Sequence, residues 1–398
     1  MEMISSQQAL KLILKNTEDF GIEEIPFLES VGRVLKEDIL ADRDFPPFDR
    51  VSMDGIAIVF DTFTAGNRTF KIENVQAAGS KQLELNNKSN CIEVMTGAVL
   101  PINTDVVIPY EQVTIANGKA IIEIDKINQL QNIHKQGNDR KKTDILIKKN
   151  RVISPSEIGI FATIGKSTVK VAKQPKALII STGDELVAVN ENPLPYQIRR
   201  SNVYSMLSLL EELKIHAETA HITDDKPLLK EKIARYLEQY DVLLFSGAVS
   251  KGKYDFLPEV LDELGVKKLF HKVKQRPGKP FWFGKKGSKS VFAFPGNPVS
   301  TYVGCLKYFY PWYKKLVGIQ YENQESAILS EDFFFKPELT YFLQVKTKNE
   351  KGRLYAIPVV GHGSGDLANL ADADAFLELP DDKSNFAKGE VFPLIRYR

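Results

Sequence analysis

The chain has 398 residues, a length that predicts two to four domains rather than one compact core. Hydrophobic residues make up 43% and charged residues 26%, the balance of a globular protein rather than a disordered or fibrous one. The 53 Lys and Arg against 51 Asp and Glu leave a net charge of +2. This balance excludes a global field for holding nucleic acid, so any anion site must be local.

The distribution of cysteines and apolar residues points to a cellular compartment. Cys91 and Cys305 are far apart, so we expect neither a disulfide framework nor a thiolate metal site, and a reducing cytoplasm fits. The first twenty residues carry Glu2, Lys11 and Lys15 within a helical apolar pattern and lack the layout of a signal peptide. No uncharged apolar stretch approaches the roughly 20 residues of a spanning helix. We therefore expect a cytoplasmic protein that is neither secreted nor integral to a membrane.

The first part of the chain predicts two small modules. Residues 5–20 carry apolar residues at helical spacing, and residues 31–40 form a mixed, partly buried segment. From about 43 to 137 the apolar runs are short and separated by Gly or Asn, which predicts a β-rich module. Within 144–171, Ser154 and the following proline predict a helix start, because Ser caps and Pro suits the first turn. We expect this segment to return to the first module.

From Lys176 onward strands alternate with helices. The predicted strands are 177–180, 241–245 and 291–294, and the predicted helices are 203–213, 257–264 and 299–309. This alternation predicts a parallel, doubly wound sheet whose carboxyl strand ends form the ligand face. After Pro311 short strands return, at 340–346, 354–360 and 375–379, without another long helix, so a terminal β-domain is expected.

Three glycine-bearing loops follow predicted strands of this sheet: ISTGDEL at 180–186, SGAVSKGKYD at 246–255 and FPGNPVS at 294–300. Such loops cradle phosphates through backbone N–H groups, and rigid prolines aim a helix start at a ligand. Taken one at a time, a capped turn or a flexible connection is the simpler interpretation. Because all three stand at strand ends of one sheet, we expect a shared anion site.

Further polar residues stand beside glycine or proline elsewhere. The segment KQRPGKP at 274–280 includes Arg276 and Lys279, for which a solvated turn is the alternative interpretation. The β-rich module adds Asp54, in PPFDRVSMDGIA, and Thr96, in MTGAVLP. Taken singly, Asp54 and Thr96 are more simply turn formers than catalysts.

Four acids suit a cation that prefers oxygen ligands. Asp54, Glu185, Asp224 and Asp255 fit Mg²⁺, which commonly bridges to phosphates. The five histidines lack any short ligand spacing, so no zinc site is expected. No arrangement of Ser, His and Asp along the chain supports a hydrolytic triad.

The motifs together, in this order and spacing, resemble the molybdopterin molybdenumtransferase family, the MoeA type that includes the gephyrin E domain. The resemblance covers nearly the whole chain. It runs through PPFDRVSMDGIAI, VMTGAVLP, DVVIPYEQV, VISPSEIGIFATIG, STGDEL, RRSNVYSMLSLLEELK, SGAVSKGKYDF, RPGKPFWFG, FPGNPVS and GHGSGDLANLADADAFLELP.

The resemblance implies a multidomain fold of α/β and β modules that agrees with the segmentation above. The expected modules are a small split domain (1–42 and 138–175), an inserted β-rich domain (43–137), a doubly wound molybdopterin-binding α/β domain (176–315) and a C-terminal β-barrel-like domain (316–398). It also implies an elongated homodimer, in which the inserted domain of one subunit helps to complete the site of the other.

The resemblance further implies a reaction and its residues. Adenylyl-molybdopterin would bind with Mg²⁺, molybdate would enter the dithiolene as substrate, and AMP would leave. The implied catalytic residues are Asp54, Thr96, Glu185 and Asp255, with Glu185 and Asp255 also holding the metal. The implied substrate-binding residues are Asp224, Ser250, Gly252, Arg276, Lys279, Pro295 and Pro298. Proton delivery to departing molybdate oxygens needs an acid, for which Asp54 or Glu185 would serve.

Three positions depart from the family pattern. SGAVS replaces the usual pair of adjacent glycines, so we expect Ala248 to tighten that turn. Arg276 stands where Lys is more usual, which keeps the charge but makes it a planar donor fork. Lys251 and Lys253 add charge to the second loop. None of these changes removes a carboxylate, so an active enzyme is expected.

Two other functions compete with this interpretation. An adenylyltransferase of the same pathway, which is also an expected partner, would need only residues like 176–312. A peptide-binding scaffold, as the gephyrin resemblance permits, would be expected to carry added domains or long linkers. The choice between molybdate and tungstate stays open.

Overall fold

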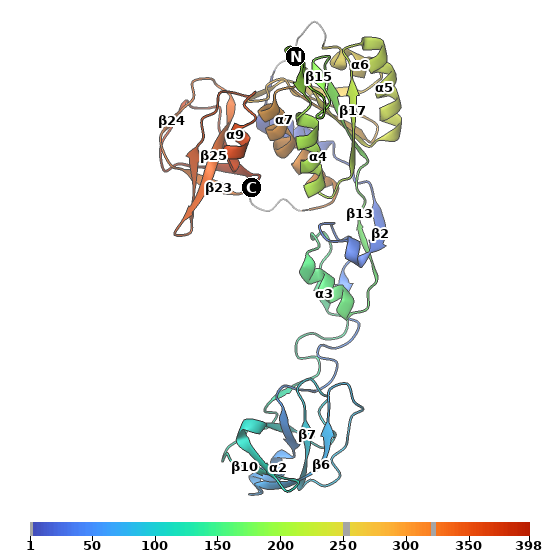
Figure 1. Ribbon diagram of the computed structural model, residues 1–398, viewed down its shortest axis with the longest axis vertical. Helices are drawn as coiled ribbons and strands as arrows, with labels where there is room; N and C mark the ends of the chain where they lie inside the picture. Colours follow the sequence, from blue (N-terminus) through green and yellow to red (C-terminus); the bar gives the residue numbers. More distant parts are fainter. Residues whose placement is uncertain (1–2, 250–254, 320–323) are drawn as a thin grey trace. The chain divides into compact units, whose positions relative to one another are not determined.

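The protein is described by a computed structural model, which places residues 3–249, 255–319 and 324–398 (Figure 1). Its internal contacts divide it into two compact units. The larger unit comprises residues 1–37, 150–158 and 167–398, and the smaller unit comprises residues 38–149 and 159–166. The finer division into four modules stays a prediction.

The larger unit contains a six-stranded sheet in the order β17, β14, β18, β22, β21, β19. The strand bounds are β14 (Ala177–Thr182), β17 (Ala217–Ile222), β18 (Val242–Ser246), β19 (Lys267–His271), β21 (Trp282–Lys286) and β22 (Lys289–Phe294). The first four strands in this order are parallel, which confirms the predicted doubly wound sheet. β21 and β19 add an antiparallel edge, because only two residues join β21 to β22 and so short a connection requires a hairpin.

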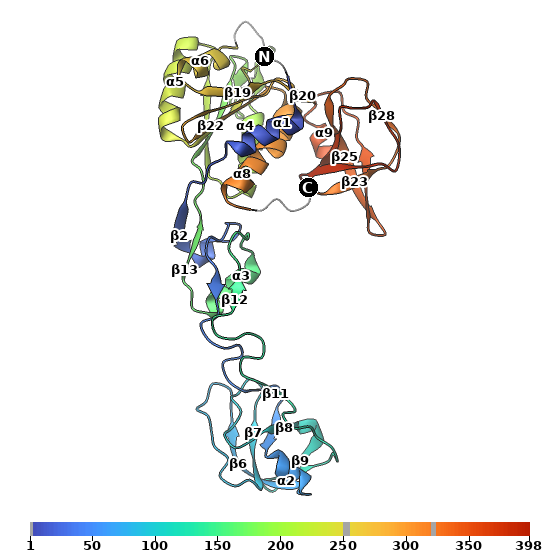
Figure 2. The same ribbon diagram turned by 180° about the vertical axis from the view of Figure 1, so that it is seen from behind.

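Helices cover both faces of this sheet (Figures 1 and 2). Their bounds are α1 (Ser6–Lys15), α4 (Asn202–Glu212), α5 (Lys226–Gln239), α6 (Leu257–Glu263), α7 (Pro298–Gly304) and α8 (Tyr310–Leu316). Alternate strand residues point to opposite faces: Ile179 packs in the cluster that includes α1, α4 and α8, whereas Ile180 packs with α5 and α6. The strands are therefore buried on both sides, as their continuous apolar runs predict.

The helix predicted at 299–309 is part of a longer helical segment. A π-helical turn, Cys305–Phe309, joins α7 to α8, so the chain stays helical past Pro311. Pro311 is tolerated because it lies in the first turn of α8, where a missing N–H costs little. Lys307 on this turn forms an ion pair with Glu378 at 2.6 Å, and both side chains are nearly buried.

The C-terminal part of the larger unit is a closed sheet. β25 pairs with both β26 and β27, so the order β25, β26, β23, β29, β27 returns to β25 and gives the predicted barrel-like domain. These strands are β23 (Ser326–Leu329), β25 (Thr340–Glu350), β26 (Arg353–Pro358), β27 (Ala375–Leu379) and β29 (Val391–Arg396). β20 (Val273–Arg276) also pairs with β25, and β1 (Ile4–Ser5) pairs with β20. The barrel is thereby tied to the region between β19 and β21.

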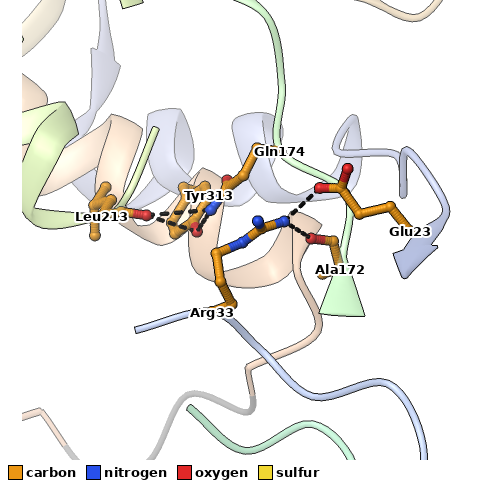
Figure 3. A network of polar contacts seen from close by, with 6 residues as sticks. All are labelled: Glu23, Arg33, Ala172, Gln174, Leu213 and Tyr313. Carbon is orange, nitrogen blue, oxygen red and sulfur yellow. Dashed lines mark hydrogen bonds and ion pairs between the residues drawn. The ribbon is translucent and has the colours of Figure 1, made fainter. Parts of the chain in front are cut away.

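A two-stranded ribbon, β2 (Ile22–Pro26) and β13 (Thr168–Ala172), pairs antiparallel near the start of the α/β region. Arg33 stabilises it, because its guanidinium donates to the carboxylate of Glu23 and, at 2.7 Å, to the Ala172 carbonyl (Figure 3). This contact fixes the end of β13 just before the chain enters the central sheet.

The next residues of the chain are fixed by a second set of contacts. The Gln174 amide donates to the Tyr313 hydroxyl at 2.8 Å and to the Leu213 carbonyl at 3.3 Å, and the Tyr313 hydroxyl donates to the same carbonyl at 3.0 Å (Figure 3). Tyr313 belongs to α8 and Leu213 follows α4, so the segment leading into β14 is held by both helices.

The smaller unit is built on a six-stranded sheet in the order β8, β5, β7, β6, β10, β9. These strands are β5 (Gly55–Ile58), β6 (Thr69–Gln76), β7 (Asn90–Val94), β8 (Val106–Pro109), β9 (Val113–Ala116) and β10 (Lys119–Ile122). Apolar residues on its two faces, such as Ile56 and Ala57, enter two separate core clusters. The β-rich character predicted for 43–137 is therefore present.

Shorter elements complete the fold. They are η1 (Phe27–Glu29), β3 (Ile39–Leu40), β4 (Arg50–Val51), α2 (Phe60–Thr64), η2 (Tyr110–Gln112), β11 (Ile133–His134), β12 (Ile145–Ile147), α3 (Pro155–Thr163), β15 (Leu186–Val187), β16 (Ile198–Arg199), β24 (Phe333–Phe334), α9 (Asn369–Asp372) and β28 (Asn385–Phe386). In the described part of the chain, none of the helices combines the length and apolar character needed to cross a membrane.

Candidate functional site

Asp54 and Thr96 lie together at one end of the smaller unit's sheet. Asp54 immediately precedes β5 and Thr96 follows β7, and these two strands pair antiparallel with Gly55 opposite Val94. One carboxylate oxygen of Asp54 accepts hydrogen bonds from the Thr96 backbone N–H at 2.6 Å and from its hydroxyl at 2.8 Å. These bonds lower the pKa of Asp54, because they stabilise the ionised carboxylate.

The glycine after Asp54 is required by packing. A Cβ added to Gly55 would lie 1.9 Å from the carbonyl oxygen of Ile108 on the neighbouring strand β8. Only glycine lets these two strands approach this closely. The Asp-Gly pair therefore places Asp54 at the sheet end by a backbone constraint rather than by a turn preference alone.

The larger unit holds a cleft of about 480 Å³ at the carboxyl ends of β14 and β18. We call it the carboxylate cleft, because Glu185, Asp224 and Asp255 all line it. The turn at Pro295–Pro298 closes one side, and the first residues of α4 line another. The ends of parallel strands thus form a ligand face, as the doubly wound pattern predicts.

The acids of the carboxylate cleft affect one another. Burial is the main cause that raises the pKa of Asp224, and the negative charges of Asp184, Glu185 and Asp255 raise it further. The Asp224 backbone N–H also donates to Asp184 at 3.1 Å. Both effects favour the protonated form of the Asp224 carboxyl.

The loop after β18 adopts the left-handed conformations that its sequence requires. Gly247 has φ +108° and Ala248 has φ +54°. A Cβ at Gly247 would lie 2.9 Å from the Thr182 hydroxyl, so glycine leaves room beside β14. Ala248 takes a conformation that favours glycine, so its Cβ strains the backbone at the position where SGAVS departs from two adjacent glycines.

A second cleft, of about 650 Å³, lies between the α/β region and the barrel. We call it the cationic cleft, because Arg276 and Lys279 line it together with aromatic residues of the barrel such as Phe335 and Tyr341. Residues 295–297 line both clefts, so the two clefts meet at the Pro-Gly-Asn turn. The structure therefore brings the cations and the carboxylates to opposite sides of one turn.

A buried glutamine shapes the cationic loop. Gln275 is 1% exposed, and its amide donates to the carbonyls of Pro277 and Gly278, each at 3.2 Å. Its carbonyl accepts a hydrogen bond from the Tyr308 hydroxyl, whose oxygen lies 3.1 Å from the Ser6 hydroxyl. The loop that presents Arg276 and Lys279 is thus fixed from beneath.

The predicted site residues fall into three groups. Asp54 and Thr96 form a pair in the smaller unit, and Ser250 and Gly252 lie outside the described residues. The remaining predicted residues line the two clefts of the larger unit: Glu185, Asp224, Asp255, Arg276, Lys279, Pro295 and Pro298.

Sequence reasoning missed four residues of these clefts. Thr182, Arg200 and Asn202 line the carboxylate cleft, and Gln275 lines the cationic cleft. The adjacent arginines before α4 could have indicated this site, because two cations directly before the start of a helix favour the binding of an anion there. The buried position of Gln275 had no sequence signal.

The carboxylates of the larger unit can be compared with the ligands that a metal ion requires. Within residues 3–249, 255–319 and 324–398, no group of three or more His, Cys, Asp or Glu side chains is arranged to hold a metal ion. Glu185 and Asp255 nevertheless line one cleft, and carboxylate oxygens are ligands that Mg²⁺ prefers. The residues therefore fit a cation that takes one or two ligands from the protein and the rest from substrate phosphates and water.

Comparison with known proteins gives matches along almost the whole chain. Residues 4–165 match the MoeA N-terminal region (domain I and II), residues 178–315 a probable molybdopterin binding domain, and residues 326–397 the MoeA C-terminal region (domain IV). Two solved structures of a molybdopterin biosynthesis MoeA protein from Pyrococcus horikoshii cover 100% of both chains, with TM-scores of 0.85 and 0.84 at 29% and 28% identity.

Curated relatives agree with these matches. The molybdopterin molybdenumtransferase of Synechocystis sp. is 39% identical over 403 residues, which cover 98% of this chain and 99% of the relative. That of Staphylococcus epidermidis is 31% identical over 401 residues, which cover 98% and 95%. The resemblance read from the motifs is confirmed, and the chain belongs to the molybdopterin molybdenumtransferase family of transferases.

Proposed function

We propose that the protein inserts molybdate into adenylyl-molybdopterin and releases AMP, in a Mg²⁺-dependent step of molybdenum cofactor biosynthesis in the cytoplasm. The observation that carries this proposal is the meeting of the carboxylate and cationic clefts at residues 295–297. A substrate with a nucleotide at one end and a pterin dithiolene at the other needs two adjoining compartments of different charge. The names of the relatives and the family of the chain support the same activity.

The cationic cleft suits the anionic groups that must be held near the dithiolene. Arg276 offers a planar fork of donors for an oxyanion, and Lys279 offers a compact charge. The loop that carries both is fixed by Gln275, so these charges are positioned before substrate arrives. We assign molybdate and the pterin dithiolene to this side, with Pro295 and Pro298 shaping the turn.

The carboxylate cleft suits the phosphoanhydride of the adenylate. Mg²⁺ held by Glu185 and Asp255 would offset the negative charge of the phosphates. Asp224, whose pKa is raised, is the better proton donor to a departing oxygen. Asp54 is the poorer one, because the hydrogen bonds from Thr96 keep it ionised. We assign Ser250 and Gly252 to the same phosphate side.

We also propose a homodimer in which Asp54 and Thr96 of one subunit complete the site on the larger unit of the other. Variants Asp54→Ala and Glu185→Ala should each lose metal insertion while keeping their fold. Mixed after unfolding and refolding, the two inactive variants should regain about a quarter of wild-type turnover, since half of the dimers then hold one intact site. No recovery in a mixture that forms mixed dimers would contradict the shared site.

The experiment that tests the function supplies purified protein with adenylyl-molybdopterin and Mg²⁺ and follows AMP with and without molybdate. We expect AMP release that depends on molybdate and is lost in Glu185→Ala and Asp255→Ala. Tight pterin binding without AMP release would instead support an adenylylating or carrier role.

A further inference from the structure

An arginine in the carboxylate cleft has a side-chain donor with no partner among the described residues. Arg200 lies between β16 and α4, and its backbone N–H donates to the Val187 carbonyl at 3.0 Å. Arg200 lines the cleft, yet its Nε is buried and has no hydrogen-bond partner in the part of the chain that the structure describes. Across the described residues, no carboxylate forms an ion pair with its guanidinium. A buried donor without a partner is costly, which points to a ligand that supplies the acceptor.

A second buried donor faces the same cleft. Thr182, the last residue of β14, is 6% exposed, and its hydroxyl has no hydrogen-bond partner among residues 3–249, 255–319 and 324–398. A Cβ at Gly247 would lie 2.9 Å from this hydroxyl, so a side chain at that position would crowd it. Thr182 and Arg200 come from different elements, so their unpartnered donors are independent observations.

The start of α4 adds a third source of donors. The side chain of Ser201, which precedes the helix, makes no capping hydrogen bond. Ser201, Asn202 and Val203 all line the cleft. The Asn202 amide is already committed to the Ser246 hydroxyl at 2.8 Å and to the Gly296 carbonyl at 2.7 Å, so it fixes the position of the helix start. An 11-residue helix with an uncapped first turn favours an anion there.

The charges that line the carboxylate cleft indicate which residue contributes most to binding an anion. Glu185, Asp224 and Asp255 repel an anionic ligand, and among the residues described around this cleft only Arg199 and Arg200 are cations. Arg199 is exposed, and its Nε donates to the Glu191 carbonyl at 3.0 Å. Of these two described cations, Arg200 is the one whose side-chain Nε is unpartnered.

We propose that Arg200 and Thr182, together with the first turn of α4, bind the phosphate of the nucleotide half of the substrate. The inference rests on the proposed function, because the nucleotide is the adenylate that leaves as AMP. Arg200 acts as a specificity-determining residue: beside the Mg²⁺ that Glu185 and Asp255 would hold, it supplies a positive charge and planar donors for the phosphate.

The test measures binding to the full-length protein by calorimetry, with AMP, adenosine and inorganic phosphate as separate ligands and Mg²⁺ present throughout. Arg200→Gln should weaken AMP binding about ten- to a hundredfold, the range for losing a charged hydrogen bond. It should leave adenosine binding unchanged. Arg200→Lys should restore part of the loss, and Thr182→Val should weaken AMP less than Arg200→Gln does.

Arg199→Gln is the matched control, since it removes one charge from the adjacent position, and AMP should bind it within about threefold of wild type. If Arg200→Gln binds AMP as tightly as wild type, or loses adenosine to the same extent, the inference is wrong while the proposed function stands. If inorganic phosphate binds as tightly as AMP, the site is a general anion site and the nucleotide assignment fails. If wild type binds no AMP, the adenylate substrate itself is contradicted.

Discussion

Thr96 donates both its backbone N–H and its hydroxyl to the same carboxylate oxygen of Asp54. The two residues are 42 positions apart, and antiparallel pairing of β5 with β7 brings them to one sheet end. Sequence reasoning treated them as two separate polar residues beside glycines. The structure shows one unit, in which Thr96 holds Asp54 as a carboxylate.

Removing the Thr96 hydroxyl tests this relationship. Thr96→Val leaves the backbone hydrogen bond and removes the other, so the pKa of Asp54 should rise partway toward its ordinary value. NMR titration of the Asp54 carboxyl would measure the change. Thr96→Ser, which keeps a hydroxyl, is the control and should leave the low pKa in place. An unchanged pKa in Thr96→Val would show that the hydroxyl does not stabilise the ionised form.

The raised pKa of Asp224 predicts a dependence of stability on pH. A carboxyl with a raised pKa in the folded state favours folding while it is protonated, and this contribution is lost as pH rises through the folded pKa. Asp224→Asn should therefore raise Tm at neutral pH and have less effect at acidic pH. Thermal unfolding at several pH values measures this difference. An equal effect at all pH values would argue against titration of Asp224.

The strain at Ala248 predicts a stabilising substitution. Ala248→Gly should increase the free energy of unfolding by up to about 1 kcal/mol, because glycine adopts positive φ without the clash of a Cβ. Urea unfolding measures the change. Ala177→Gly, in the buried strand β14, is the control and should destabilise. A loss of stability in Ala248→Gly would mean that the methyl group contributes packing that outweighs the strain.

The nearly buried ion pair between Lys307 and Glu378 joins the π-helical turn to the barrel strand β27. Glu378→Ala should destabilise the protein by about 3–5 kcal/mol, because Lys307 is left buried without its partner. The double variant Lys307→Met and Glu378→Leu removes both charges and should recover most of the loss. Denaturant unfolding would measure the free energy of unfolding of wild type, Glu378→Ala and the double variant. Equal stability of Glu378→Ala and wild type would show that Lys307 reaches water.

Gln275 is expected to act as a positioning residue for Arg276 and Lys279. Gln275→Leu removes the donors to the Pro277 and Gly278 carbonyls and should raise KM for the pterin substrate more than it lowers kcat. Tyr308→Phe, which removes one donor to Gln275, should give a smaller change in the same direction. A loss confined to kcat would contradict a role in positioning these binding residues.

The sequence predicts the sheet domain well where the pattern is local. β14, β18 and β22 follow from apolar runs, and α4 and α6 follow from helical spacing. Helix α5 was not predicted although Leu229, Ile233 and Leu237 are spaced four apart and are buried, because its charged residues dilute the apolar stripe.

Longer-range features could not be read from the chain. β20 overlaps the segment KQRPGKP, for which no strand was predicted, and it is a strand because it pairs with β1 and with β25 of the barrel. The residues of the candidate site were likewise predicted only where a local pattern marks them. Carboxylates were found by their place after strands, whereas the unpartnered donors of Thr182 and Arg200 are visible only once the cleft is formed. Burial and partnership depend on residues far away in sequence, and a single sequence does not encode them in a local pattern.

The most direct test of the central claim combines AMP release with reconstitution. Purified protein would receive adenylyl-molybdopterin, Mg²⁺ and molybdate, and its product would be offered to a cofactor-free molybdoenzyme while AMP is measured in parallel. We predict that AMP release and recovery of molybdoenzyme activity both require molybdate and rise together. Two results would contradict metal insertion as the function of this protein. One is AMP release at the same rate with and without molybdate, and the other is AMP release without recovery of molybdoenzyme activity.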